Sequence, residues 1–451
     1  MALSLKNINL RRTSIIVIAL FAIGLLIRVA LINTHGTSDF NDYIKWGKNT
    51  HEIGLSKAFE GGYFPIQYLS FGASYAIAQH YSISAEKVIR IFNTIFEIGI
   101  LFLLIYILKK YISIQNILIY FWLNPFALIM YQQGYVDAQF SFFVLLALAM
   151  LTAGNDNFKK YFIAGIPLGI SLLMKPQPVP LFLGLGILAV IFFIHKHKKE
   201  AAKMACLFAA PFIIYLAFSL YFGFTMDINN NHKTLPRISR AIQEKSNLSK
   251  RMSDIGANSL FLTAQYAYVA TKRMPAINAN MPNPWFFTAV ALNKNNVNIY
   301  LIKDTDRILG VQYRTIGSIL FFVVAITIMF KIARSNNHLD RKTIFLLCLI
   351  PIILPYLTTS AHENHFYLGF ISTIILGSLL KDKFILSSGY ILGALNGIHI
   401  LYLYAMPYYF HTQYDIVAKM PLVAASIIVF FVLLYHLLRK SYKNEELILA
   451  Q

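Results

Sequence analysis

The chain has 451 residues, of which 57% are hydrophobic and 13% are charged, whereas an average soluble protein is about 25% charged. This composition excludes an ordinary soluble enzyme, and apolar runs such as 13–33 and 344–357 are typical of segments that span a lipid bilayer. Forty Lys and Arg against twenty Asp and Glu give a formal charge of +20, which we attribute to topology and membrane lipids rather than to nucleic acid. Cys206 and Cys348 fall in apolar segments, so we expect two reduced packing residues and no disulfide framework.

The first apolar run, 13–33, predicts an uncleaved membrane helix. It lacks a small-residue cleavage site and ends in a polar stretch at 33–35. Arg11 and Arg12 precede the run, so the positive-inside rule places its start in the cytoplasm and its end outside.

Residues 63–81 decide the orientation of all that follows. This segment is apolar enough to span but contains Gln67 and His80, and counting it as a span would place every later basic cluster outside. We therefore predict that residues 37–85 form an outer loop whose helices lie on the membrane. Half of all Lys and Arg residues then fall in inner loops, as the positive-inside rule requires.

This assignment of inner and outer loops predicts an all-α polytopic membrane protein with about 12 transmembrane helices and both termini in the cytoplasm. The spans are expected at 13–33, 88–108, 115–131, 138–153, 159–174, 177–194, 202–222, 314–333, 343–360, 366–380, 384–404 and 419–438. Two outer segments are long enough to carry chemistry, namely the first outer loop (34–87) and a polar, basic loop at 223–313.

Short polar clusters mark the predicted outer helix ends. Asp39 and Asp42 follow the first span, where a carboxylate held above the bilayer is able to take a proton from a hydroxyl. The alternative is that Asp39 caps the next helix. A second cluster, 132–139, contains Asp137 and Gln139, which either contact substrate or are ordinary polar residues of a helix end.

Lys175 and Gln177 form a third cluster at the end of an apolar run. The lysine lies against the charge bias, so it either reaches toward the interface along its apolar stem or faces an anionic group. An aromatic cluster at 399–411 is interpreted as an interfacial belt or as a surface for sugar stacking.

The turn at 358–366 joins two apolar runs and contains His362, Glu363 and His365. A metalloprotease helix needs its histidines at positions i and i+4. Here the spacing is i and i+3, so we expect no metal. Within the predicted spans, Arg28 and Glu97 lie at similar depths, and we expect a structural ion pair between them.

Taken in order, these motifs resemble the glycosyltransferase C (GT-C) superfamily, polytopic enzymes that use polyprenyl-phosphate sugars on the extracytoplasmic face. The similarity points to the glucosyltransferases of N-glycan assembly and to the GPI-type mannosyltransferases with their bacterial relatives. The matching segments are Asp39-Phe40-Asn41-Asp42-Tyr43-Ile44-Lys45-Trp46, Leu123-Asn124-Pro125-Phe126 with Gly134-Tyr135-Val136-Asp137-Ala138-Gln139-Phe140, Lys175-Pro176-Gln177-Pro178, and His362-Glu363-Asn364-His365-Phe366.

Asn364 stands where the family has a cation, and we expect His365 to take over that phosphate contact. The resemblance covers about the first 180 residues and the stretch near 355–370. It implies a GT-C-type transmembrane module over 1–222 that includes the first outer loop, a long extracytoplasmic loop at 223–313, and C-terminal transmembrane helices over 314–451.

The function implied by the resemblance is the transfer, with inversion, of a single hexose (mannose or glucose). The donor would be a polyprenyl-phosphate-linked sugar, and the acceptor a glycan, a glycolipid or a protein at the outer face of the cytoplasmic membrane. We expect no cofactor and no metal. Asp39 is the expected general base, with Asp42 second. The expected contacts to the donor phosphate and substrate are Lys175, Gln177, His362, Glu363, His365, Asp137, Gln139, Arg237 and Arg240.

Two other classes of protein stay open. A lipid-linked O-antigen polymerase or ligase is also polytopic with a large outer loop, but it would not need the early Asp39. A transporter or lipid flippase agrees with the many spans, although the sequence has no internal repeat and few intramembrane charges.

Overall fold

The computed structural model describes residues 2–59, 63–153, 156–222, 276–292, 302–334, 339–405 and 416–442. Over these residues the chain is almost entirely helical, and several helices are long and apolar enough to cross a membrane. The protein is therefore an all-α, multi-pass membrane protein, as its composition predicts.

The helices of the first half are α1 (Ala2–Leu31), α2 (Asp39–Ile53), α3 (Leu55–Ala58), α4 (Pro65–His80), α5 (Ala85–Leu108), α6 (Ile114–Ile117), the π-helix η1 (Leu118–Trp122), α7 (Pro125–Gln133), α8 (Asp137–Thr152), α9 (Phe158–Leu172), α10 (Val179–Ile194) and α11 (Lys198–Phe222). The second half contains α14 (Pro284–Leu292), an antiparallel hairpin of β1 (Arg307–Ile308) and β2 (Val311–Gln312), α15 (Tyr313–Arg334), α16 (Leu339–Leu357), the 3-10 helix η4 (Glu363–Phe366), α17 (Tyr367–Leu379), α18 (Lys383–Ile400), the π-helix η5 (Leu401–Ala405) and α20 (Ile416–Tyr442).

Every segment that the sequence predicts as a span overlaps a helix of the structure. In the part of the chain that the structure describes, six helical stretches are able to cross a membrane by length and composition, and they lie in α1, α5, α11, α15, α18 continued by η5, and α20. A seventh is formed if the bent segment Ile114–Trp122 plus Pro125–Gln133 counts as one span. Helix α4, with 16 residues, falls short of that length, and so do α8, α9, α10 and α17 at predicted spans, with 13 to 16 residues each.

The predicted single span at 115–131 is a broken helix. Its two parts meet at an angle of 45°, because Pro125 has no N–H to donate to the preceding turn. The buried Asn124 starts the second part by accepting a hydrogen bond from the backbone N–H of Phe126 at 2.9 Å. An Asn-Pro pair therefore acts here as a cap and a break inside an apolar run.

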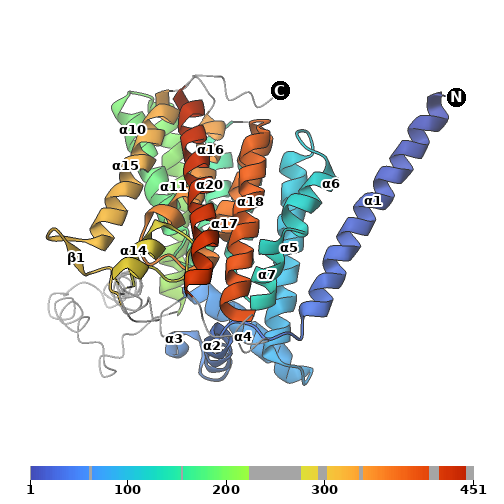
Figure 1. Cartoon of the computed structure of the whole chain (residues 1–451). Coiled ribbons are helices and arrows are strands. Elements are labelled where there is room, and N and C mark those ends of the chain that lie inside the picture. The colour runs from blue at the N-terminus through green and yellow to red at the C-terminus, as the bar shows by residue number, and fades with distance from the viewer. Residues whose placement is uncertain are drawn as a thin grey trace.

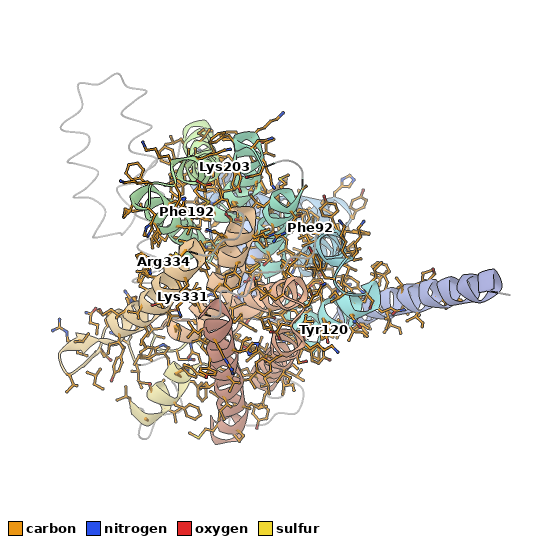
Figure 2. The ribbon with its side chains drawn as sticks, turned by 90° about the horizontal axis from the view of Figure 1, so that it is seen from above. Phe92, Tyr120, Phe192, Lys203, Lys331 and Arg334 are labelled. Atoms are coloured by element: carbon orange, nitrogen blue, oxygen red, sulfur yellow. The ribbon has the colours of Figure 1, made fainter. Side chains whose placement is uncertain are left out.

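Helices α2, α3 and α4 lie together across one end of the long helices, which we call the α2 end (Figure 1). Helix α1 leads down to this end and α5 leads away from it, while α1 begins and α20 ends at the opposite end. Figure 2 views the opposite end and labels the basic side chains of Lys203 on α11 and of Lys331 and Arg334 on α15.

Helices α2 and α4 cross in close contact because glycine stands at the crossing. A Cβ atom on Gly47 would lie 2.6 Å from the backbone oxygen of Phe71. Aromatic rings fill the remaining interface, with Tyr43 stacked on Phe71 at 4.6 Å between centroids and Trp46 stacked on Tyr68 at 5.2 Å. The first loop is thus a packed layer with its own aromatic core.

The main hydrophobic core is one cluster that draws residues from α5 through α20. Within it, the predicted ion pair is confirmed, since Arg28 Nε lies 2.6 Å from Glu97 Oε2 and both side chains are buried. Tyr367 also donates to Glu97 at 3.2 Å, which joins α1, α5 and α17. Cys206 and Cys348 are both free thiols, as expected.

Candidate functional site

The start of α2 is fixed by a ring that packs against a glycine. Gly134 has a left-handed backbone with φ of +78°, and a Cβ atom there would lie 2.0 Å from the Phe40 ring. The guanidinium carbon of Arg90 lies 4.9 Å from the centre of the same ring, while Arg90 donates to the backbone oxygens of Thr34 at 2.9 Å and Gln132 at 2.7 Å. These contacts hold Asp39, which precedes Phe40, against the turn before α8.

The start of α4 is bonded to the turn before Lys175. The backbone N–H groups of Phe64 and Ile66 donate to the carbonyl oxygens of Met174 at 3.0 Å and Leu173 at 2.8 Å. Because α2 packs on α4, these bonds place the first-loop motif and the Lys175 motif side by side.

Gln139 links three helices. Its side-chain oxygen accepts hydrogen bonds from Gln67 at 2.9 Å and Ser70 at 2.8 Å, both on α4, and its amide donates to Asn93 of α5 at 3.0 Å. The side chain of this predicted substrate contact therefore joins α4, α5 and α8 in the structure.

Lys175 and Asp137 form a buried ion pair. Lys175 Nζ lies 2.8 Å from each carboxylate oxygen of Asp137, and the two side chains are 5% and 1% exposed. Asn364 donates to the same carboxylate at 3.0 Å. Three of the predicted motifs thus meet at one carboxylate.

Glu363 binds two tyrosines through one of its carboxyl oxygens. Tyr135, from the turn before α8, donates to Oε1, and Tyr404 of η5 donates to the same atom at 2.6 Å. The Glu363 side chain is buried, and its other oxygen, Oε2, has no hydrogen-bond partner among the described residues. Burial raises the pKa of this carboxyl group above its usual value.

A segment of the long loop holds the turn that carries His362. Residues 276–280 run beside it, with bonds from Ala279 N to Ala361 O at 3.2 Å and from Ser360 N to Ile277 O at 3.1 Å. Ser360 has φ of +56°, a strained left-handed conformation for a residue with a side chain.

Asp304 supports this strained position. Its buried carboxylate accepts hydrogen bonds from Ser360 Oγ at 2.8 Å and from Arg314 Nε and Nη2 at 2.8 and 2.7 Å. The start of α15 is therefore tied through Asp304 to the turn before η4.

Asp39 is half-buried at the first residue of α2, and the hydroxyl of Tyr43 donates to it at 3.4 Å. Burial raises the pKa of Asp39, and a negative charge on Glu363 would raise it further. The positive charge of Lys175 acts in the opposite direction. These electrostatic interactions place Asp39 in the same cluster as Glu363 and Lys175. Asp42, in contrast, is exposed on α2.

The two histidines of the turn carry no positive charge near pH 7. Burial lowers the pKa of His362 to about 4 and that of His365 to well below its usual value. Both rings are therefore neutral near pH 7, so His362 offers a hydrogen bond and no fixed positive charge. His365 Nδ1 accepts a hydrogen bond from the backbone N–H of His362 at 3.2 Å.

Of the remaining predicted contacts, Gln177 is half-buried, and its side-chain oxygen has no hydrogen-bond partner in the part of the chain that the structure describes. Arg237 and Arg240 lie outside the described residues. Over those same ranges, no three His, Cys, Asp or Glu side chains are grouped so as to hold a metal ion.

Sequence reasoning missed several polar partners in this cluster. Tyr135 lies inside a quoted motif and Tyr404 inside the aromatic cluster, but neither position in the sequence predicts a hydrogen bond to Glu363. Tyr43 lies on α2 four residues after Asp39, and this spacing predicts that the two side chains share one face of the helix. Asp304 carries no local motif that would have marked it.

The arrangement offers acid–base chemistry next to a buried cation. It contains a partly accessible carboxylate with a raised pKa, an ammonium group held by a second carboxylate, neutral imidazoles and a third carboxyl group bound by phenols. Such a set is able to accept a proton from a hydroxyl and to donate hydrogen bonds to an anionic oxygen.

No protein-family model matches this chain, and no curated protein is significantly similar to it in sequence. The resemblance to the GT-C superfamily therefore depends on the quoted motifs alone and stays a prediction.

Proposed function

We propose that this protein is a membrane glycosyltransferase of the GT-C type that transfers one hexose from a polyprenyl-phosphate sugar to a glycan, glycolipid or protein. The observation that carries the proposal is the convergence of its motifs. Asp39, Asp137, Lys175 and Glu363 come from four separate parts of the sequence and influence one another at the α2 end. Motifs that are weak singly gain weight when they share one site.

In the proposed reaction, Asp39 accepts the proton of the acceptor hydroxyl as that oxygen attacks the anomeric carbon from the face opposite the leaving phosphate. The bond from the anomeric carbon to the phosphate oxygen breaks, and its electron pair leaves with the polyprenyl phosphate. One displacement inverts the anomeric configuration. A carboxylate with a raised pKa is a better proton acceptor than an ordinary exposed aspartate.

The leaving phosphate needs hydrogen-bond donors and positive charge. An ammonium group has three N–H donors, so the two bonds from Lys175 to Asp137 leave one for a phosphate oxygen. His362 contributes as a neutral donor, and the sequence offers Arg237 and Arg240 as further cations.

The proposal includes twelve spans, both termini in the cytoplasm, and a site at the outer face of the cytoplasmic membrane. Single cysteines introduced at Ser56 and Asn336 test this topology. A membrane-impermeant thiol reagent should label position 56 in intact cells and position 336 only after permeabilisation. Labelling of position 336 in intact cells would refute the orientation.

The function is tested by mass spectrometry of cell-envelope glycans with and without the gene. A glycan that lacks one hexose in the deletion strain, and regains it with the wild-type gene but not with the Asp39→Asn variant, supports the proposal. If Asp39→Asn restores the glycan fully, the result favours a flippase over a glycosyltransferase, because lipid translocation does not need a proton acceptor at position 39.

A further inference from the structure

The two oxygens of the Glu363 carboxyl group lie in opposite environments. Oε1 accepts hydrogen bonds from both Tyr135 and Tyr404. Oε2 is equally buried, yet over the described ranges of the chain it meets no donor and no acceptor, and the residue as a whole is 2% exposed. A buried polar atom without a partner in an otherwise bonded group points to a missing ligand atom.

An ionised carboxylate shares its charge between both oxygens. Leaving one charged oxygen buried and unpaired is more unfavourable than leaving a neutral O–H there, because the desolvation penalty of a charged group is larger. The geometry of Glu363 therefore favours a protonated carboxyl group, in which Oε1 is the carbonyl oxygen that accepts from the tyrosines and Oε2 carries the proton.

The charges around Glu363 act in both directions, because the ammonium group of Lys175 lowers its pKa while nearby carboxylates repel a negative charge on it. The charged and titratable groups that face it from the neighbouring elements are Asp39 of α2, Asp137 of α8, Lys175 after α9, Tyr135 before α8, Tyr404 of η5 and the adjacent His362. Two of these groups are carboxylates, and the ammonium group is already bonded to one of them. A third ionised carboxylate would add like-charge repulsion to a site proposed to hold a phosphate.

The phenol groups, the backbone N–H of Glu363 and the charge of Lys175 act in the opposite direction, because donors and cations stabilise the charged form of a carboxyl group and lower its pKa. Burial outweighs them, so the pKa of Glu363 is raised overall. The neutral form is populated below that raised pKa and is lost as the pH rises through it.

We propose that Glu363 is a neutral carboxylic acid whose Oε2–H donates a hydrogen bond to a phosphate oxygen of the bound lipid-phosphate sugar. This assignment deepens the proposed glycosyltransferase function and rests on it for the identity of the ligand. A neutral donor suits an anionic ligand in an acidic site, since it adds a short O–H···O⁻ hydrogen bond without adding another negative charge.

Protonation is tested without any substrate. Infrared spectroscopy of the wild-type protein in detergent at pH 7 should show the carbonyl stretch of a protonated carboxyl group, which disappears on titration to high pH. The Glu363→Gln variant should lack this band. Glu52→Gln, a matched change at an exposed residue of α2, should retain it. Absence of the band in wild type, or its persistence in Glu363→Gln, would overturn the assignment.

Donation to the ligand is tested by binding of a short-chain isoprenyl monophosphate to the full-length protein. Glu363→Gln should bind within about threefold of wild type, because its amide N–H replaces the O–H. Glu363→Ala should bind about tenfold or more weakly, the expected loss for one charge-assisted hydrogen bond. Thermal denaturation of each variant checks that both are folded.

The outcomes separate the two proposals. If the infrared band belongs to Glu363 but Glu363→Ala binds the isoprenyl phosphate as tightly as wild type, the donor role is wrong whatever the enzyme does. If Glu363→Gln binds at least tenfold more weakly, an ionised carboxylate is required and the neutral-acid assignment fails. If both tests succeed and the glycan analysis finds no missing hexose, the proposed glycosyltransferase function fails while the phosphate-binding acid stands.

Discussion

The buried pair of Lys175 and Asp137 makes a quantitative prediction. Lys175→Met keeps the apolar stem but removes the cation, so Asp137 loses two of the three hydrogen bonds that it accepts. Removing one partner of a buried ion pair destabilises a protein by about 3–5 kcal/mol. Protonation of Asp137 limits the loss, because an ordinary aspartate with a pKa near 3.9 takes up a proton at pH 7 for about 4 kcal/mol.

Two consequences follow from this limit. The destabilisation of Lys175→Met should be about 3–4 kcal/mol at pH 7 and should shrink by roughly 1.4 kcal/mol for each unit of lower pH, because the proton replaces the lost cation. The double variant Lys175→Met/Asp137→Asn should recover most of the stability, since it has no unpaired charge.

Reversible unfolding in mixed detergent micelles, followed by tryptophan fluorescence at several pH values, measures these free energies. The same variants should be tested for binding of an isoprenyl monophosphate. We expect the double variant to regain stability but not phosphate affinity, and Lys175→Ala to raise the Michaelis constant for the donor. If Lys175→Met is as stable as wild type at pH 7, the ion pair has no structural role. If the double variant also regains full affinity, Lys175 does not contact the phosphate.

Further predictions concern the base and its support. Asp39→Asn should remain folded and lose at least about a hundredfold in turnover, as expected for a lost general base. Asp42→Asn, at an exposed position, should lose much less turnover. Equal losses in both variants would contradict the assignment. Because the pKa of Asp39 is raised, the transfer rate should fall as the pH decreases, at a pH above the usual aspartate range. If Asp39→Asn has the same acidic limb in its pH–rate profile, that limb belongs to another group. Gly134→Ala should destabilise the protein by about 2–5 kcal/mol, the sum of a left-handed backbone for alanine and displacement of Phe40, and a melting temperature equal to wild type would count against this packing.

Much of the helical framework could be predicted from the sequence, because apolar runs of span length leave few alternatives to a helix. The pair of Arg28 and Glu97 was predictable for a related reason, since charges inside apolar helices nearly always have partners. The break at Asn124 and Pro125 carries a local signal too, but the apolar run around it hid the break.

The candidate site was less accessible to sequence reasoning. Its motifs were recognisable, but the role of each side chain depends on neighbours that are far away in the chain. Lys175 was expected to reach the interface or to face an anionic group, and the structure pairs it with Asp137. His362 was an expected phosphate contact, and the structure adds that burial makes it neutral. Asp304 had no visible role until the fold brought it to Ser360.

The long separations within the site have a consequence for synthesis. Asn364 is 227 positions beyond Asp137, and Glu363 is 228 positions beyond Tyr135. The ribosome therefore delivers the first partners to the membrane well before the second ones exist. Asp137 and Lys175 are only 38 positions apart, so they can neutralise each other while the rest of the chain is being made. The ion pair of Lys175 and Asp137 is thus one that the nascent protein can complete before the turn at 358–366 has been made.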